Sequence, residues 1–193
     1  MYSTVLFDFD GTLVSSLSLW TRAYQFALSG FGFEIDLDEV KSTCFYRHFA
    51  DICESYKIAD VAEFRTQMNR GLHEAFTDAQ LFTAARECLI TCRELGMKTG
   101  LVTSSELHLV EPALSKLSLD TLLDTVVTGC QVAHCKPHPE PIHRALASLR
   151  STAETTLFVG DYEVDVVAGK AAGVTTALFF PAEHEQYYSL ARL

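Results

Sequence analysis

The chain has 193 residues, of which 48% are hydrophobic and 21% are charged. This length suits one domain, or one domain with a modest insertion, and the apolar content excludes a generally disordered chain. The 25 acidic residues outnumber the 15 basic ones, and the net charge of −10 argues against an extended nucleic-acid surface. No apolar run is long enough to cross a membrane, and no basic region precedes the first apolar run as in a signal peptide. We therefore expect a cytoplasmic globule of enzyme size, with its six cysteines reduced.

The first predicted element is a buried strand over Thr4–Phe9, a β-branched and aromatic run that ends in the polar loop at Asp10-Gly11. Residues 14–81 follow, with apolar residues at helical spacing and no convincing strand. This spacing covers Leu17–Leu28, Val40–Tyr56 and Val61–Phe76, and it predicts three or four helices there. We expect residues 14–81 to form a small all-helical subdomain, inserted into a core made of residues 1–13 and 82–193.

After residue 81, short apolar runs alternate with segments of helical spacing. The predicted strands are Lys98–Val102, Thr125–Thr128, Thr156–Val159 and Thr175–Phe179. The predicted helices are Ala84–Leu95, part of Leu107–Leu117, Pro139–Leu149 and Val164–Ala172, with Ala182–Arg192 as a candidate for a last helix. Pro112 either begins or kinks its helix. This alternation predicts an α/β fold with a Rossmann-like parallel sheet that helices cover on both faces.

Polar side chains follow three of the predicted strands. Asp8 and Asp10 stand at the end of the first, residues 103–105 after the second, and Asp161 and Asp165 after the fourth. In an open parallel sheet, ligands gather beyond the carboxyl ends of the strands. Residues two apart on an extended chain point the same way, and residues four apart share one side of a helical turn. Four clustered carboxylates repel one another unless a cation joins them, and Mg²⁺ suits such ligands.

Each of these residues also has a structural explanation. An Asp-Gly pair after a strand often forms only a turn, and an acidic residue such as Asp165 suits a helix start. Thr103 is an ordinary residue after a strand, and Lys136 could be a solvated loop charge. For Asp8 the structural explanation is weak, because a carboxylate inside an apolar strand is costly to bury without a partner or a function.

Four motifs together carry a resemblance to a known family. The four motifs of the haloacid dehalogenase superfamily resemble, in this order, four segments of this chain. These segments are residues 8–13 (DFDGTL), Thr103, Lys136 in a Lys-Pro-x-Pro-Glu segment, and Gly160-Asp161-x-x-x-Asp165. Residues 168–174 are similar to the helix after the fourth motif in its phosphoglycolate phosphatase and beta-phosphoglucomutase branch. The resemblance covers residues 4–179 and implies that residues 14–81 are the helical cap of that branch.

The resemblance implies an Mg²⁺-dependent phosphatase that acts on a small phosphorylated metabolite. Asp8 would be the nucleophile that forms an aspartyl-phosphate, and Asp10 would protonate the leaving oxygen and then activate water. Thr103 would bind a phosphoryl oxygen, and Lys136 would offset negative charge. The implied magnesium ligands are Asp8, the backbone carbonyl of Asp10, Asp161 and, in an outer or orienting role, Asp165. The further phosphate-binding candidates are Gly11, Thr12 and Ser104.

Two observations bear on the subclass. Members that displace halide lack the acid at the position of Asp10, because halide needs no proton, so we do not expect a dehalogenase. Many relatives carry Asp-Ser shortly after the first motif, whereas this chain has Ser15-Ser16, which affects any substrate assignment at the cap entrance. A phosphomutase and a non-catalytic binding protein on the same scaffold are the alternative functions.

Within the predicted cap, Arg47 and His48 are the candidates for contact with the non-phosphate end of a substrate, although both suit a solvated helix face. A cation at Arg47 would favour a small acidic substrate such as phosphoglycolate. We expect a monomer or homodimer, with no nucleic-acid or membrane partner.

A second group of possible ligands is Cys130, His134, Cys135 and His138. Its spacing is not a familiar zinc pattern, and Lys136-Pro137 occupies its middle, which disfavours zinc there. We expect Mg²⁺ as the cofactor and no organic cofactor.

Overall fold

The computed structural model describes residues 1–45 and 47–181, so the predicted helix over Ala182–Arg192 lies outside the described residues. The chain divides into two compact units. The α/β unit consists of Met1–Ser15 and the chain from Gln80 onward, and the helical unit consists of Ser16–Ala79. The amide of Ser15 donates to the carbonyl of Gln80 at 3.0 Å, and that of Phe82 to Leu13 at 3.0 Å. The chain therefore leaves and re-enters the α/β unit along paired segments. No helix in the described part of the chain is long and apolar enough to span a bilayer.

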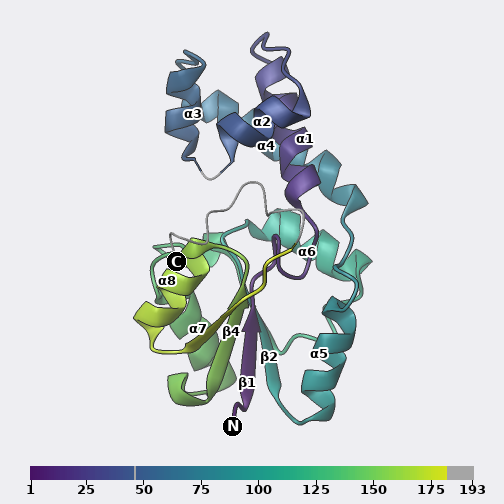
Figure 1. The fold of residues 1–193 in the computed structure, drawn as a ribbon, viewed down its shortest axis with the longest axis vertical. Helices are drawn as coiled ribbons and strands as arrows, with labels where there is room; N and C mark the ends of the chain where they lie inside the picture. Colours follow the sequence, from purple (N-terminus) through teal and green to yellow (C-terminus); the bar gives the residue numbers. More distant parts are fainter. Residues whose placement is uncertain (46, 182–193) are drawn as a thin grey trace. The chain divides into compact units, whose positions relative to one another are not determined.

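Five parallel strands form the sheet of the α/β unit (Figure 1). Their order across the sheet is β3 (Thr125–Val127), β2 (Lys98–Val102), β1 (Thr4–Phe7), β4 (Thr156–Gly160) and β5 (Thr175–Leu178). In the register, Leu6 of β1 stands between Gly100 of β2 and Phe158 of β4. All four residues of β1 are buried, as expected for a central strand. The predicted α/β fold with a Rossmann-like parallel sheet is confirmed.

The described residues of the α/β unit also contain four α-helices: α5 (Ala85–Glu94), α6 (Leu107–Lys116), α7 (Glu140–Leu149) and α8 (Glu163–Ala172). Helix α7 packs on β2 and β3, α8 packs on β4 and β5, and α5 contacts β2 from the other side of the sheet (Figure 1). One buried cluster joins the strands to α7 and α8 and includes Leu6, Phe158 and Ile142. Pro112 lies inside α6 rather than at its start. Short 3₁₀ turns occur at η2 (Gly129–Gln131) and η3 (Ala153–Thr155).

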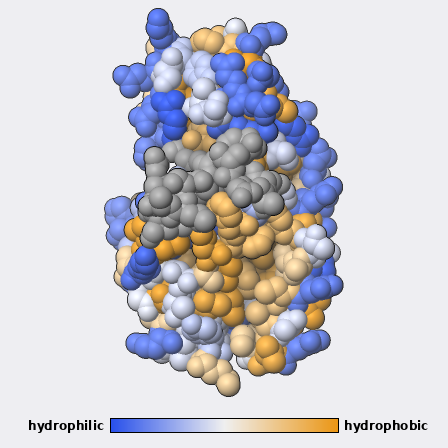
Figure 2. Space-filling view, viewed as in Figure 1, coloured by the Kyte–Doolittle hydropathy of each residue, from blue (hydrophilic) through white to orange (hydrophobic). Residues whose placement is uncertain are grey.

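The two faces of β4 differ in burial. Phe158 points into the cluster with α7 and α8 and is fully buried, whereas its neighbours Leu157 and Val159, which point the opposite way, are half-buried. On that second side the rings of Phe82 and Phe179 meet edge to face at 5.1 Å. Figure 2 shows apolar residues gathered on the visible face of the α/β unit. In the described part of the chain, helices thus cover the two faces of the sheet to different extents.

The helical unit contains α1 (Leu17–Ser29), α2 (Leu37–Cys44), α3 (Phe49–Ser55), α4 (Val61–Ala75) and the short turn η1 (Phe76–Asp78). Helices α1 and α4 approach closely because residue 71 is glycine, and a Cβ there would lie 3.0 Å from the Cα of Ala23. Aromatic rings pack inside the helical unit. The ring of Phe49 lies edge to face with those of Tyr24 and Phe64, with ring centroids 6.2 and 5.7 Å apart.

Two helices occupy the stretch Val40–Tyr56, so the described residues of this unit hold four α-helices, within the three or four that the sequence predicts. Helix α2 begins early because the carboxylate of Asp36 accepts hydrogen bonds from the amides of Asp38 and Glu39, at 3.0 and 2.8 Å. It ends where Phe45 adopts an extended conformation, and α3 begins after His48, which is also extended.

The close packing of α8 on β5 yields a stability prediction. A Cβ on Gly169 would lie 2.0 Å from the Thr176 Cγ2 atom. We expect Gly169→Ala to lower the free energy of unfolding by about 1–3 kcal/mol, even though alanine is the better helix former. Thr176→Ser removes the opposing methyl group, so the double variant should recover most of the loss in urea unfolding. A double variant as unstable as Gly169→Ala alone would contradict this steric explanation.

Candidate active site

The carboxyl ends of β1, β2 and β4 lie next to one another, and each is followed by a predicted site residue. Asp8 follows β1, Thr103 follows β2 and Asp161 follows β4. The Asp8 amide donates to the carbonyl of Val159 at 2.8 Å, so Asp8 is still held in the sheet. Gly11, with φ of +79°, then allows the turn after Asp10, in a conformation that side chains other than glycine rarely adopt.

Three carboxylates come together at this edge of the sheet. Asp8, Asp161 and Asp165 are buried, and each offers an oxygen within 4.8 Å of the others. Thr12 Oγ1 donates to Asp161 Oδ1 at 3.2 Å, which brings another predicted residue into the cluster. Gly160 makes room for Asp165, because a Cβ on Gly160 would lie 2.4 Å from the Asp165 Cβ. The predicted metal-binding side chains are therefore neighbours in the structure.

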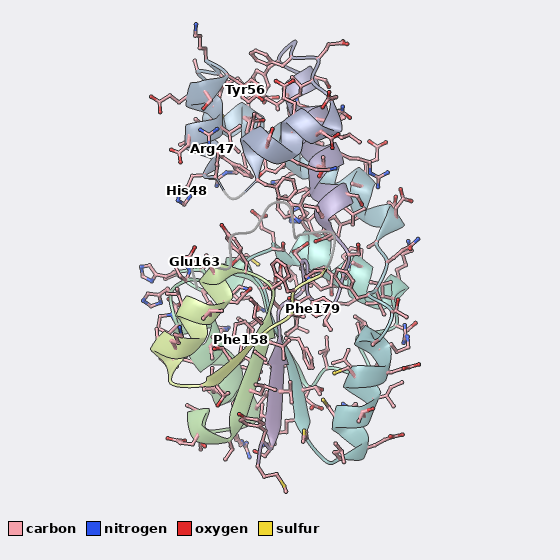
Figure 3. All side chains as sticks on the ribbon, viewed as in Figure 1. Arg47, His48, Tyr56, Phe158, Glu163 and Phe179 are labelled. Carbon is pink, nitrogen blue, oxygen red and sulfur yellow. The ribbon has the colours of Figure 1, made fainter. Side chains whose placement is uncertain are left out.

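Lys136 supplies a buried cation to this cluster. Its side chain is 4% exposed, and Nζ contacts Asp8 Oδ1 and lies 2.7 Å from Asp165 Oδ1. Nζ also donates to the carbonyl of Val102 at 3.1 Å and stands 5.6 Å from the ring centroid of Phe158, which Figure 3 labels on β4. Burial lowers the pKa of Lys136, but the carboxylates of Asp165 and Asp8 outweigh burial and raise it above its ordinary value. Lys136 is therefore protonated.

The cluster keeps an excess of negative charge. Burial raises the pKa of Asp8; Lys136 opposes this rise, while the carboxylates of Asp165, Asp161 and Asp10 add to it. Among the described residues, Lys136 Nζ contacts two of the three buried carboxylates, those of Asp8 and Asp165. Within the part of the chain that the structure describes, Asp165 Oδ1 has no hydrogen-bond partner of good geometry, although it lies 2.7 Å from the Lys136 ammonium group. Buried oxygen ligands with unbalanced charge fit a hard divalent cation such as Mg²⁺.

The second oxygen of Asp165 has a hydrogen-bond partner in the backbone. Asp165 Oδ2 accepts a hydrogen bond from the amide of Tyr162 at 3.1 Å, at the start of α8. This bond and the contact with Lys136 fix the orientation of the carboxylate. Asp165 thus connects the start of α8 to the ammonium group.

Asp10 is held by a residue that the sequence analysis did not select. Ser105 Oγ donates to Asp10 Oδ2 at 2.6 Å, and the Ser105 amide donates to Thr103 Oγ1 at 3.0 Å. Thr103 and Ser105 are buried, whereas the predicted phosphate ligand Ser104 has an exposed side chain. The carbonyl of Ser104 packs on the turn at Gly129, where a Cβ would come within 2.4 Å of it. Alternation along the run from Thr103 could have indicated Ser105.

Arg47 makes its described contacts inside the helical unit. Its guanidinium donates to the carbonyls of Thr43 and Asp51, both at 2.9 Å, and to Ser55 Oγ at 2.7 Å. Arg47 therefore connects the end of α2 to α3. The neighbouring His48 precedes α3 and makes no side-chain capping bond; Figure 3 labels both residues in this unit.

The chain was compared with known proteins. The family model described as haloacid dehalogenase-like hydrolase matches residues 5–179. The pyrophosphatase PpaX of Anoxybacillus flavithermus is 32% identical over 179 residues, which cover 91% of this chain and 82% of that protein. PpaX of Bacillus cereus matches with the same identity and coverage.

Solved structures show the same fold. A candidate phosphoglycolate phosphatase from Lactobacillus plantarum is 20% identical, with a TM-score of 0.82 over 92% of this chain and 86% of that chain. CbbY from Rhodobacter sphaeroides, in complex with phosphate, is 19% identical, with a TM-score of 0.78 over 94% and 87% of the two chains. The family match and the PpaX relatives show that the chain belongs to the haloacid dehalogenase-like hydrolases, as a hydrolase of the phosphatase type.

Proposed function

We propose that this protein is a magnesium-dependent phosphatase that releases phosphate from a small phosphorylated metabolite through an aspartyl-phosphate on Asp8. The observation that carries this proposal is the buried cluster of Asp8, Asp161 and Asp165, in which the ammonium group of Lys136 touches two of the three carboxylates. Such a site combines a nucleophile, a fixed positive charge and oxygen ligands for a divalent cation. These are the groups that phosphoryl transfer requires.

Asp8, Asp161 and the backbone carbonyl of Asp10 would hold the Mg²⁺ ion. When bound, the ion would neutralise charge between the carboxylates and the phosphoryl group of the substrate. Asp165 acts as the orienting group, which its contacts with Lys136 and with the Tyr162 amide support.

In the first step, an oxygen of Asp8 attacks phosphorus, so that a new O–P bond forms as the bond to the leaving oxygen breaks. Asp10 donates its proton to that leaving oxygen. Asp10 then takes a proton from water, whose oxygen attacks the aspartyl-phosphate and releases phosphate and the Asp8 carboxylate. The bond from Ser105 supports this role, because it holds Asp10 in one orientation.

Other residues of the same edge would bind the phosphoryl oxygens. Lys136 compensates their negative charge next to Asp8. Thr103 accepts a bond from the Ser105 amide, so its hydroxyl hydrogen can point to a phosphoryl oxygen. Thr12 and the turn at Gly11 follow Asp10 directly and complete the proposed phosphate site, with Ser104 as an exposed neighbour.

For the substrate, inorganic pyrophosphate is the first compound to test. The relatives that are 32% identical over 91% of the chain are named pyrophosphatases. Phosphoglycolate is the second, on the proposal that Arg47 receives a carboxylate. Three hydrogen bonds of the Arg47 guanidinium already lie inside the helical unit, so a substrate would compete with them or use its remaining donors.

The activity itself can be tested with para-nitrophenyl phosphate and pyrophosphate. We expect phosphate release that requires Mg²⁺ and stops with a chelator. Asp8→Asn should lower kcat by more than about 10³-fold, because the nucleophile is lost. The exposed Asp120 provides the control, and Asp120→Asn should keep full activity. Activity that persists in Asp8→Asn would contradict the proposal, and conversion of a hexose 1-phosphate to its 6-phosphate isomer would indicate a mutase.

The roles of the two neighbouring serines can be separated by their alanine variants. Ser105→Ala removes a hydrogen bond to a charged group. If this raises the activation free energy by about 1.5–3 kcal/mol, kcat should fall roughly 10–150-fold. Ser104→Ala should have a smaller effect, because that side chain is exposed. Steady-state kinetics of both variants provides the measurement, and the reverse order of effects would refute the assignment of Ser105 to Asp10.

Lys136 should also matter for stability, because it pairs with two buried carboxylates. We expect Lys136→Met to lower the free energy of unfolding by about 3–5 kcal/mol when measured with a chelator present, since two buried charges lose their partner. Lys170→Met on the exposed side of α8 should change it by less than about 0.5 kcal/mol. Similar losses in the two variants would contradict this account.

A further inference from the structure

A second group of metal-ligating side chains lies outside the carboxylate cluster. Among the described residues, His134, His138 and Glu140 each offer a ligand atom, and these atoms lie within 4.8 Å of one another. All three belong to the segment that runs from η2 into the first turn of α7, and both histidines are exposed. Dissolved ions can therefore reach this group directly.

The three ligand atoms converge on one position. Glu140 Oε2 lies 3.1 Å from His134 Nδ1 and 3.9 Å from His138 Nδ1. The two imidazole rings stand side by side, with centroids 4.7 Å apart and planes inclined by 35°. Two ring nitrogens and one carboxylate oxygen thus surround the same small volume.

The carboxylate is held in place by the backbone. Glu140 Oε1 accepts a hydrogen bond from the Ala133 amide at 2.8 Å, and Oε2 accepts one from the His134 amide at 3.1 Å. The Ala133 amide, together with the side chain of His134, also lowers the pKa of Glu140, which keeps the group ionised. An ion that binds here does not have to order its carboxylate ligand, and this favours affinity.

We propose that His134, His138 and Glu140 form a binding site for Zn²⁺. Two imidazoles with one carboxylate suit zinc, whereas Mg²⁺ prefers oxygen ligands alone. This ligand set differs from the one that the sequence disfavoured, because Glu140 takes the place of the two thiols. Cys135 Sγ instead donates to the Gly129 carbonyl at 3.8 Å, and Cys130 Sγ lies 3.3 Å from Thr128 Oγ1.

The position of the site connects it to Lys136. His134 and His138 stand two residues before and two residues after Lys136 in the chain. An ion bound to both histidines closes this turn. It replaces the hydrogen bond between His134 Nδ1 and Glu140 Oε2 and the 3.2 Å bond from the Glu140 amide to His138 Nδ1. Zinc would therefore restrain the segment that carries the buried ammonium group.

Calorimetric titration with Zn²⁺ tests the proposal, on the full chain with Mg²⁺ in excess so that the carboxylate cluster is not available to zinc. We expect one zinc per chain, and a loss of affinity in His134→Ala and in His138→Ala that exceeds the roughly 10–100-fold effect of removing an outer-shell partner. His108 is the matched control: it is exposed and lies 3.2 Å from Glu106, and no second histidine completes that pair among the described residues. His108→Ala should bind zinc like the unmodified protein.

A second readout identifies the ligands directly. Co²⁺ in place of zinc should give the visible absorption of a nitrogen-ligated ion, and this absorption should disappear in both histidine variants but not in His108→Ala. Unchanged zinc affinity in His134→Ala and His138→Ala, equal loss in the control, or no zinc bound by the unmodified protein would each overturn the proposal. The titration needs no substrate, so its outcome is independent of whether the phosphatase assay succeeds.

Discussion

The arrangement of the candidate site depends on one ammonium group held among carboxylates. Lys136 Nζ contacts Asp8 after β1 and Asp165 in α8, and it donates to the carbonyl of Val102 at the end of β2. Lys136 itself stands in the segment after β3. A buried charge is tolerated only with partners, so this single nitrogen fixes how the loops of four neighbouring strands meet.

The fold could be predicted because its local patterns agree with its tertiary structure. Runs such as Thr4–Phe7 carry apolar residues on both faces of the strand, and segments of helical spacing separate these runs, which is typical of a parallel sheet. The order of the strands could not be derived, because β1 pairs with β2 and β4 across long stretches of chain that leave no local trace. The place of the break between α2 and α3 could not be derived either, because the extended backbone at Phe45 and His48 interrupts an apolar spacing that continues through it.

In the candidate site, the sequence indicated the residues that end strands but not the bonds that orient them. Asp8 stood out because an acid inside an apolar strand is costly. Ser105 did not, because three consecutive hydroxyl residues look alike, and only the backbone shows that Thr103 and Ser105 turn inward while Ser104 is exposed. Glu140 appeared only as part of a motif, although its carboxylate holds two backbone amides of the loop before α7.

The central place of β1 has a consequence for the order of folding. Its partners begin at Lys98 and Thr156, so both of its pairings close long loops, and the entropy of loop closure delays such contacts. The helical unit, Ser16–Ala79, lies wholly between β1 and β2 and can gather its own apolar residues first. The first strand therefore cannot pair along both of its edges until the chain has been synthesised beyond β4. The side chains that gather around Asp8 also come late in the chain, because Lys136, Asp161 and Asp165 all follow β3, so the candidate site is completed after most of the architecture.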